Sequence, residues 1–334
     1  MIYDLCLAFK KKGCDVTLAA SDLYKPSENE SYPFNIIWMR TRLTKLFPPH
    51  TLPYCPEVKK IAKSGNFDLI ITSEVFSLNS LKLALCTPKN LIVWQELGKH
   101  NRIFHGLASK FWYGIVAKIG FKKALIVARS VQAKEFISKY CKNVSDTIID
   151  HGVNIEKFTP CREKDSQFAI SSQLISRKHI EKSIEAFAKY LNKYDDSAKL
   201  YIMGDGDEKE NLRKLAKDLG ADKNIIFTGK LGHNKLIEIL KKSIAMLVYT
   251  EKDNNMVSIV ESIALATPVI TTDIPYNASY IKAEKLGIVN NNWNDDDLRK
   301  LATSDEYINN CMNYRKYLPT EYKAEQFLKV KGLI

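Results

Sequence analysis

The chain has 334 residues, which is more than one ordinary hydrophobic core organises and is the length expected of two α/β domains. Its 45% hydrophobic and 26% charged residues argue against a disordered chain, and the lack of an apolar run of about 18 residues argues against a membrane-spanning helix. The seven cysteines are scattered and form no Cys-x-x-Cys motif. Neither a disulfide framework nor a zinc site is therefore predicted, and a cytoplasmic location is expected.

The positive charge is concentrated in the first half of the chain. Residues 1–150 hold 22 Lys and Arg against 12 Asp and Glu, a net charge of +10, whereas the remainder adds +2. A basic first half could bind an anionic membrane surface, a lipid-phosphate acceptor or nucleic acid. Alternatively, its charge simply keeps the protein in solution. Because the sequence has no helix-turn-helix, zinc or aromatic-basic signature, no nucleic-acid partner is expected.

In chain order, the first half alternates helices with short apolar strands. A helix is predicted over Asp4–Gly13, where Gly13 ends it, and another over about 131–140. The predicted strands are Asp15–Ala20, Phe67–Thr72, Asn90–Trp94 and Ala124–Ala128. The hydrophobic residues of 24–56 recur with no clear periodicity, and this stretch is expected to form a variable segment.

The segment Ser109–Lys123 mixes aromatic residues with lysines at helical spacing. Such a helix could lie on a membrane surface, with its apolar side chains inward and its lysines at the level of the lipid headgroups. Alternatively, its aromatic side chains pack into the domain core and its lysines face water. The residues alone leave both interpretations open.

A linker is expected between Phe158 and Ser166, and the second half then repeats the strand-helix alternation. The predicted strands are Phe168–Ser172, Lys199–Met203, Asn224–Thr228, Ile244–Tyr249 and Val269–Thr272. The predicted helices are Lys182–Tyr194, 207–219, His233–Lys242, Val257–Ala266 and Tyr317–Val330. This order indicates a parallel sheet, whose strands carry ligand-binding loops at their carboxyl ends.

Two acidic residues flank the start of one predicted helix. Asp253 lies in the loop before it, and Glu261 lies eight residues later inside it. The free N–H groups of Met256, Val257 and Ser258 would point at the space between them, and such a helix start favours an anion, commonly phosphate. Alternatively, the two residues are a loop acid and a solvated helix acid.

Four motifs occur in order along the second half. They read IIDHGVNIEKF at 148–158, QLISRKH at 173–179, GDGDE at 204–208, and Asp253-x7-Glu261 followed by TPVI at 267–270. Together they resemble the signatures of family-four retaining glycosyltransferases, also called glycosyl transferases group 1, of the kind found in bacterial surface polysaccharide biosynthesis. Two positions differ: Asp253 stands where the family has Glu, and Gln173 stands where it has Arg.

The resemblance implies the GT-B fold, in which two Rossmann-like α/β domains face a cleft. The acceptor-side domain is expected at residues 1–155, joined by a C-terminal helix at about 316–334. The donor-binding domain is expected at residues 156–315. The family's opening strand and glycine-rich loop have no counterpart here, so the first strand of the N-terminal domain is expected to be missing.

The resemblance also implies site residues. The groups expected on the donor diphosphate are Lys178, Arg177, Gln173 and the amides of Met256, Val257 and Ser258. Glu261 is expected at the ribose, Asp253 at the transferred sugar, and Glu96 or His100 near that sugar. The donor pocket is completed by Gly204, Asp205, Lys230 and Leu231, the last two at the base. Neither a metal nor another cofactor is expected, since the nucleotide sugar is a substrate.

The function expected from the resemblance is transfer of a sugar from a nucleotide-diphosphate sugar to a glycan or lipid-linked acceptor, in capsule, O-antigen or other surface glycan assembly. Peripheral contact with the anionic inner face of the cytoplasmic membrane is expected from the charge. The alternative is a non-catalytic, glycosyltransferase-like subunit that binds a glycan or a partner transferase.

Overall fold

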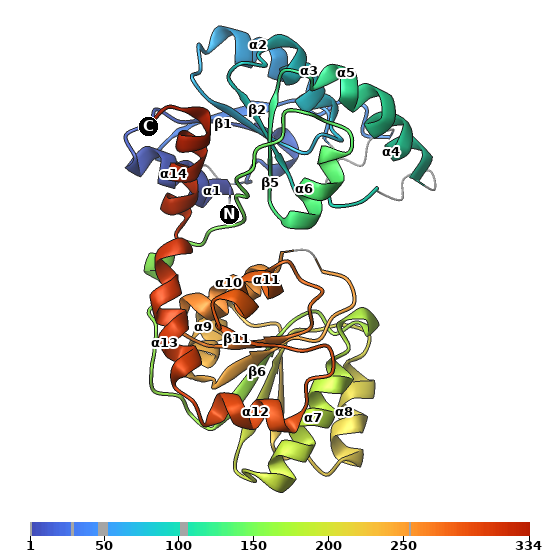
Figure 1. Cartoon of the computed structure of the whole chain (residues 1–334), viewed down its shortest axis with the longest axis vertical. Helices are drawn as coiled ribbons and strands as arrows, with labels where there is room; N and C mark the ends of the chain where they lie inside the picture. Colours follow the sequence, from blue (N-terminus) through green and yellow to red (C-terminus); the bar gives the residue numbers. More distant parts are fainter. Residues whose placement is uncertain (1, 28–29, 46–52, 101–105, 254) are drawn as a thin grey trace. The chain divides into compact units, whose positions relative to one another are not determined.

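The computed structural model describes residues 2–27, 30–45, 53–100, 106–253 and 255–334 (Figure 1). The chain divides into two compact units. The first domain holds Met1–His151 and Thr320–Ile334, and the second holds Gly152–Pro319. Among the residues with a described structure, no helix is both long and apolar enough to cross a membrane.

The first domain is built on two groups of parallel strands. β1 (Thr17–Ser21) pairs with β2 (Asn35–Met39), and a three-stranded sheet has the order β3-β4-β5. The bounds of that sheet's strands are β3 Ile70–Ser73, β4 Leu91–Gln95 and β5 Leu125–Ala128. The helices are α1 Ile2–Lys11, α2 Val58–Ser64, α3 Leu78–Cys86, α4 Leu107–Phe111, α5 Lys118–Gly120, α6 Val131–Ser138 and α14 Thr320–Lys331, with the 3₁₀ turn η1 at Asp22–Tyr24 and a π-helical turn, η3, at Trp112–Ala117.

The central strand β4 explains why this sheet is covered on both faces. Its residues Leu91–Trp94 are nearly fully buried, and successive side chains enter opposite cores. Leu91 and Val93 join one hydrophobic cluster, whereas Ile92 and Trp94 join the other. A continuous apolar strand of this kind is expected where helices cover both sides of a parallel sheet.

The last helix, α14, packs on the first domain although the second domain precedes it in sequence. Phe327 is fully buried and lies edge-on to Trp94, with ring centroids 5.3 Å apart. Lys12, directly after α1, pairs with Glu325 at 2.6 Å. This helix therefore completes the core of the first domain.

The second domain contains a six-stranded parallel sheet of order β11-β10-β9-β6-β7-β8. Its strands are β6 Gln167–Ser171, β7 Lys199–Met203, β8 Ile225–Gly229, β9 Ala245–Leu247, β10 Val269–Thr271 and β11 Gly287–Val289. Its helices are α7 Ile180–Lys193, α8 Lys209–Asp218, α9 His233–Lys242, α10 Val257–Ala264, α11 Asn277–Ala283, α12 Asp295–Ala302 and α13 Glu306–Tyr314, with 3₁₀ turns η4 Ile155–Lys157, η5 Ser176–Lys178 and η6 Arg315–Tyr317. The predicted α/β architecture of two Rossmann-like domains is confirmed.

We predict that Phe327→Ala destabilises the first domain by about 3–5 kcal/mol, because it removes a fully buried aromatic ring and leaves a cavity beside Trp94. The free energy of unfolding, followed by circular dichroism in urea, measures this effect. Ile334→Ala is the control, since Ile334 is 66% exposed. An equal, small change in both variants would contradict the core role of α14.

Candidate functional site

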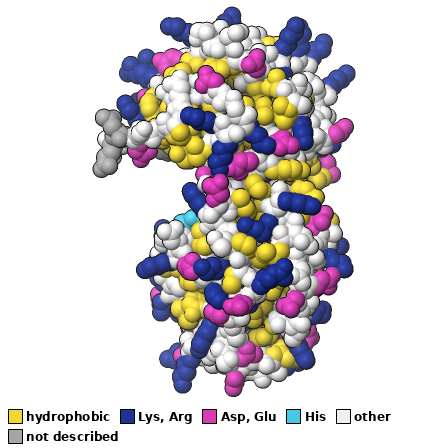
Figure 2. All heavy atoms as spheres, turned by 90° about the vertical axis from the view of Figure 1, so that its left-hand side faces the viewer, with side chains coloured by type: hydrophobic (Ala, Val, Ile, Leu, Met, Phe, Trp, Pro, Cys, Tyr) yellow, Lys and Arg dark blue, Asp and Glu magenta, His cyan; other side chains and the backbone are white. Residues whose placement is uncertain are grey.

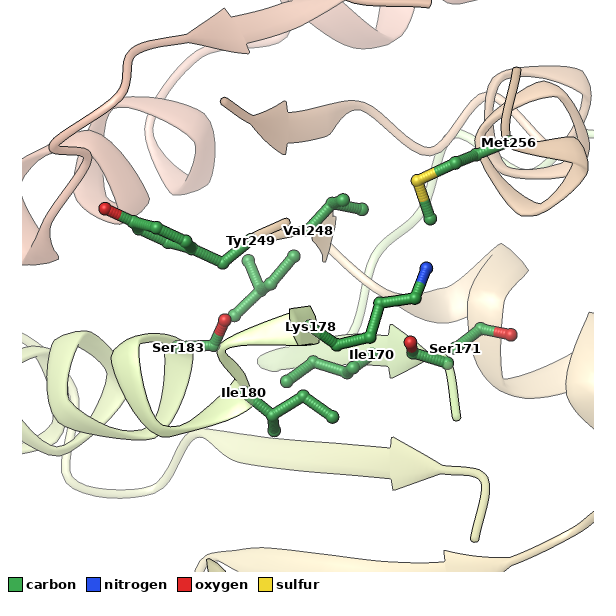
Figure 3. A pocket seen from close by; sticks show the side chains of 10 residues that line it. Ile170, Ser171, Lys178, Ile180, Ser183, Val248, Tyr249 and Met256 are labelled. Atoms are coloured by element: carbon green, nitrogen blue, oxygen red, sulfur yellow. The ribbon is translucent and has the colours of Figure 1, made fainter. Parts of the chain in front are cut away.

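The polar loops of the second domain gather where the strand order reverses. From β6 the chain proceeds through β7 to β8 on one side, and it then continues through β9 to β11 on the other. The carboxyl ends of strands at such a reversal form a ligand-binding crevice in open parallel sheets. Lys178 follows β6, and Asp253 follows β9. Figure 3 shows a small hollow here, with the Lys178 amine extending toward Met256.

The ion pair between Lys178 and Asp253 is the central contact of this site. Nζ of Lys178 donates to Oδ2 of Asp253 at 2.7 Å. Both side chains are largely buried, at 10% and 15% exposure. Lys178 ends the 3₁₀ turn η5, and the left-handed backbone of His179 (φ 42°) then starts α7. The turn thereby directs the Lys178 amine into the crevice.

Two further side chains hold the Asp253 carboxylate. Nη1 of Arg177 donates to Oδ1 at 3.1 Å, and the buried Thr250 hydroxyl donates to Oδ2. Burial acts to raise the pKa of Asp253, but the hydrogen bonds from Lys178, Thr250 and Arg177 outweigh it, so the pKa lies below its ordinary value. Asp253 is therefore an anion that holds two cations in the ligand-free site.

The start of α10 lies beside this ion pair. Met256 is the N-cap residue, and its amide already donates to Oδ1 of Asn277 at 2.7 Å. The expectation that this amide is available for an anion is therefore corrected. The amides of Val257 and Ser258 find no acceptor within the described part of the chain. Two of the three predicted helix-start donors thus remain available, and the fully buried Asn277 fixes the loop before them.

Glu261 lies on α10 and is paired with a residue that the motifs do not identify. Nε2 of His233 lies 3.0 Å from Oε1 of Glu261, and the His233 ring packs edge-on to Phe158. His233 is the first residue of α9, directly after the loop that follows β8. The only feature of the sequence that points to His233 is its position two residues after Leu231. Thr250 was also missed, since a threonine at a strand end is unremarkable.

The glycine loop after β7 fits against the loop after β6. A Cβ on Gly204 would lie 1.8 Å from the backbone oxygen of Ser172, and a Cβ on Gly206 would lie 2.3 Å from that of Leu174. The Leu174 amide donates to the Asp205 carbonyl at 3.0 Å. Glycine is thus required at both positions for the two loops to approach this closely.

The remaining predicted donor residues lie on neighbouring loops of the same sheet edge. Gln173 is exposed between Ser172 and the buried Leu174. Asp205 is exposed, and its pKa is lowered by the Gly206 amide and by Lys209. The amide of Gly204 donates to the carbonyl of Gly229 at 3.0 Å, which ties the Gly204 loop to the segment that leads to exposed Lys230 and half-buried Leu231.

In the first domain, Glu96 lies at the carboxyl end of β4 in a charged cluster. Its Oε2 accepts from Nη1 of Arg129 at 2.7 Å, and Arg129 is 4% exposed and stacks on Trp94. The Glu96 amide donates to Glu74, whose pKa is raised by burial to about 7. His151, beside Arg129, has its pKa lowered to about 4, first by burial and then by Arg129.

His100 is held inside the first domain by both ring nitrogens. Nδ1 lies 3.0 Å from the Ser109 hydroxyl, and Nε2 lies 3.1 Å from the Tyr140 hydroxyl. Its ring also packs edge-on to Tyr113 and Phe136. Both alternatives near the sugar are partly exposed; the Glu96 side chain is 39% exposed, whereas both ring nitrogens of His100 already contact hydroxyl groups of the domain.

Within the ranges that the structure describes, no three His, Cys, Asp or Glu side chains come together in the manner of a metal site. The chemistry available in the second domain is electrostatic. It comprises a buried lysine, an adjacent arginine and two helix-start amides, flanked by two carboxylates. This combination suits a polyanion that also carries hydroxyl groups.

Comparison with known proteins relates the chain to a family. Residues 154–314 match the family model described as "Glycosyl transferases group 1". The alpha-monoglucosyldiacylglycerol synthase of Streptococcus pneumoniae is 24% identical over 68% of this chain, and the chain spans 57% of that relative's length.

Two solved structures resemble the whole chain. A glycosyltransferase from Rickettsia africae has a TM-score of 0.72 at 16% identity, covering 99% of this chain and 93% of its own. HepE of Anabaena, solved in complex with UDP, has a TM-score of 0.68 at 12% identity, covering 99% and 96%. At this identity the likeness establishes the fold, so the predicted GT-B fold is confirmed.

We predict that Asp253→Asn lowers the free energy of unfolding by about 1–3 kcal/mol at pH 7, because charged hydrogen bonds from Lys178 and Arg177 are lost. Since the pKa of Asp253 is lowered in the folded state, its stabilisation is present above about pH 4 and is lost as the pH falls through that lowered pKa.

The difference in melting temperature between the wild type and Asp253→Asn should therefore shrink as the pH falls from 7 toward 2. Differential scanning calorimetry at several pH values measures it. Asp207→Asn is the matched control on an exposed loop carboxylate. A difference that stays constant over this pH range would refute the assignment of the ionised form to Asp253.

Proposed function

Because the chain belongs to the glycosyl transferases group 1 family through residues 154–314, we propose that it is a retaining glycosyltransferase. The bond from the sugar C1 to the diphosphate oxygen breaks, C1 bonds to an acceptor hydroxyl oxygen, and the hydroxyl proton is released. The observation that carries the proposal is that Lys178 and Met256, the N-cap residue of the helix that carries Glu261, line one hollow where the strand order reverses.

Lys178 and the amides of Val257 and Ser258 would bind the donor diphosphate. A bound diphosphate would replace Asp253 as the anion next to Lys178, so the ligand-free ion pair keeps the amine neutralised and oriented. Asp253 could then turn toward the sugar hydroxyls. As the C1–oxygen bond breaks, negative charge grows on the diphosphate, and these fixed donors stabilise it in the transition state.

Glu261 would hold the ribose hydroxyls, with His233 orienting its carboxylate at 3.0 Å. The loop that carries Lys230 and Leu231 would contact the base, and Gly204 lets the neighbouring loop close against Ser172. Gln173 supplies an uncharged amide where the family has arginine. In this chain Arg177, which already contacts Asp253, is the second cation of the site.

For the acceptor, we propose a glycan or lipid-linked hydroxyl in surface glycan assembly, reached at the inner face of the cytoplasmic membrane. The support is the net charge of +10 over residues 1–150 and the resemblance to a relative named for synthesis of a glucosylated diacylglycerol. Within the first domain, Glu96 would be the carboxylate that accepts a hydrogen bond from a sugar hydroxyl.

The proposal is tested by donor binding and slow donor hydrolysis with UDP-, GDP- and ADP-sugars. We expect one nucleotide class to raise the melting temperature of the wild type. Lys178→Ala and Glu261→Ala should abolish that shift and lower donor turnover about 10²–10³-fold, because each removes a contact to the donor.

The matched controls are Lys189→Ala and Glu238→Ala, which remove exposed side chains of the same types from α7 and α9. Both should bind and turn over the donor as the wild type does. Absence of a shift with every nucleotide sugar, from a folded protein, would instead favour the non-catalytic subunit that binds a glycan or a partner transferase.

A further inference from the structure

The segment from α4 through η3 to α5 forms one continuous helical rod, residues 107–120. Large apolar side chains recur on it at every fourth position. This apolar row consists of Leu107, Phe111, Ile115 and Ile119, which are 67%, 62%, 51% and 73% exposed. Single exposed apolar side chains are ordinary on protein surfaces, but four in one row on one helix form a patch that marks an interaction site.

The rod is firmly attached to its domain by the opposite face. Ser109, Tyr113, Ala117 and Phe121 lie two positions along from the apolar row and are at most 1% exposed. Tyr113 packs edge-on to Phe136, and Trp112 donates to the Val75 carbonyl at 2.9 Å. The apolar row therefore faces outward on a folded helix: of the aromatic side chains of Ser109–Lys123, Tyr113 and Phe121 enter the core, while Phe111 does not.

Lysines run alongside the apolar row. Lys110 and Lys118 lie three positions after Leu107 and Ile115, which places them on the adjacent helix row, and Lys122 lies in the turn just after the rod; all three are exposed. No Asp or Glu occurs between Glu96 and Glu135. By contrast, Lys and Arg on the face drawn in Figure 2 are interspersed with acidic side chains.

We propose that the apolar row and its flanking lysines dock on the surface of an anionic lipid membrane. The apolar side chains would enter the boundary between headgroups and acyl chains, and the lysines would meet lipid phosphates. The rod is about 21 Å long at 1.5 Å per residue, and it would lie in the plane of the membrane surface.

A second copy of this chain fits the face less well. A symmetric contact through the apolar row would bring two lysine rows against each other, and like charges oppose that contact. An anionic lipid surface supplies both the apolar layer and the opposite charge. The inference rests on the proposed function in one respect: an enzyme that modifies a lipid-linked acceptor must reach that surface.

The test is co-sedimentation of the full chain with vesicles, either phosphatidylglycerol mixed with phosphatidylcholine or phosphatidylcholine alone, at low salt. We expect binding to the anionic vesicles. The double variant Phe111→Ser/Ile115→Ser should lower the partition coefficient about tenfold or more, because two apolar side chains no longer enter the lipid. Lys118→Glu/Lys122→Glu should weaken the same binding, and raised salt should weaken that of the wild type.

Two matched variants control for surface changes in general. Leu219→Ser/Ile226→Ser changes apolar residues of 38% and 36% exposure in the second domain, and Lys59→Glu/Lys60→Glu reverses two exposed lysines on α2. The variant Leu219→Ser/Ile226→Ser should bind anionic vesicles as the wild type does. The variant Lys59→Glu/Lys60→Glu should weaken vesicle binding less than Lys118→Glu/Lys122→Glu does. Circular dichroism verifies that every variant is folded.

Three results would overturn the proposal. One is no binding to either kind of vesicle. Another is binding that the Phe111→Ser/Ile115→Ser variant leaves unchanged. The third is a dimer in sedimentation velocity that this variant abolishes while vesicles are not bound, which assigns the face to a second copy. Donor hydrolysis without vesicles is measured in parallel, since it should be unchanged in this variant. For the wild type, hydrolysis without vesicle binding would count against the docking surface alone, and vesicle binding without hydrolysis would count against the proposed enzyme activity alone.

Discussion

Burying a charge in a protein is unfavourable unless an opposite charge and hydrogen bonds accompany it, and the second domain is arranged around this constraint. Lys178 is 10% exposed and carries its charge into the crevice where the strand order reverses. Asp253 accompanies it from the other side of that reversal, and Thr250 and Arg177 complete the hydrogen bonds of the carboxylate. The pair therefore fastens the loops after β6 and β9 to each other. A diphosphate that enters this site exchanges one anion for another, so the lysine need never be buried alone.

Backbone geometry holds the other donors of the proposed site in place. Asn277 is fully buried and accepts from the Met256 amide, which fixes the loop just before α10, and the next two amides have no acceptor among the residues that the structure describes. Gly204 allows the loop after β7 to contact the backbone of Ser172. Donors held in place by the fold lose little conformational entropy when an anion arrives, which is the physical basis of preorganised electrostatic stabilisation.

Much of the second domain's fold and of its candidate site could be predicted from the sequence, because short apolar runs and motif spacings are local features of the chain. The apolar runs at Phe168–Ser172 and Lys199–Met203 coincide with β6 and β7, and the eight-residue spacing from Asp253 to Glu261 correctly spans the start of α10. The partners of those acids could not be predicted. Thr250 reaches Asp253, His233 reaches Glu261 and Asn277 reaches the Met256 amide through contacts set by packing. None of the three has a periodicity or motif of its own. The Met256 amide was mistaken for a free donor for the same reason, since its acceptor lies 21 positions later in the chain.

In the first domain, buried charges at the strand ends are likewise accompanied by partners. One helix differs, because it exposes apolar side chains and lysines to water. Arg129 is buried at the end of β5, and Glu96 and the ring of Trp94 accompany its charge. His151 beside it stays neutral at physiological pH because burial lowers its pKa to about 4. On the rod of residues 107–120, by contrast, apolar side chains face water while lysines flank them without acidic neighbours in sequence. Interior charges are thus neutralised within the domain, whereas this surface exposes a row of apolar side chains beside exposed lysines, a combination that the proposed anionic lipid surface would match.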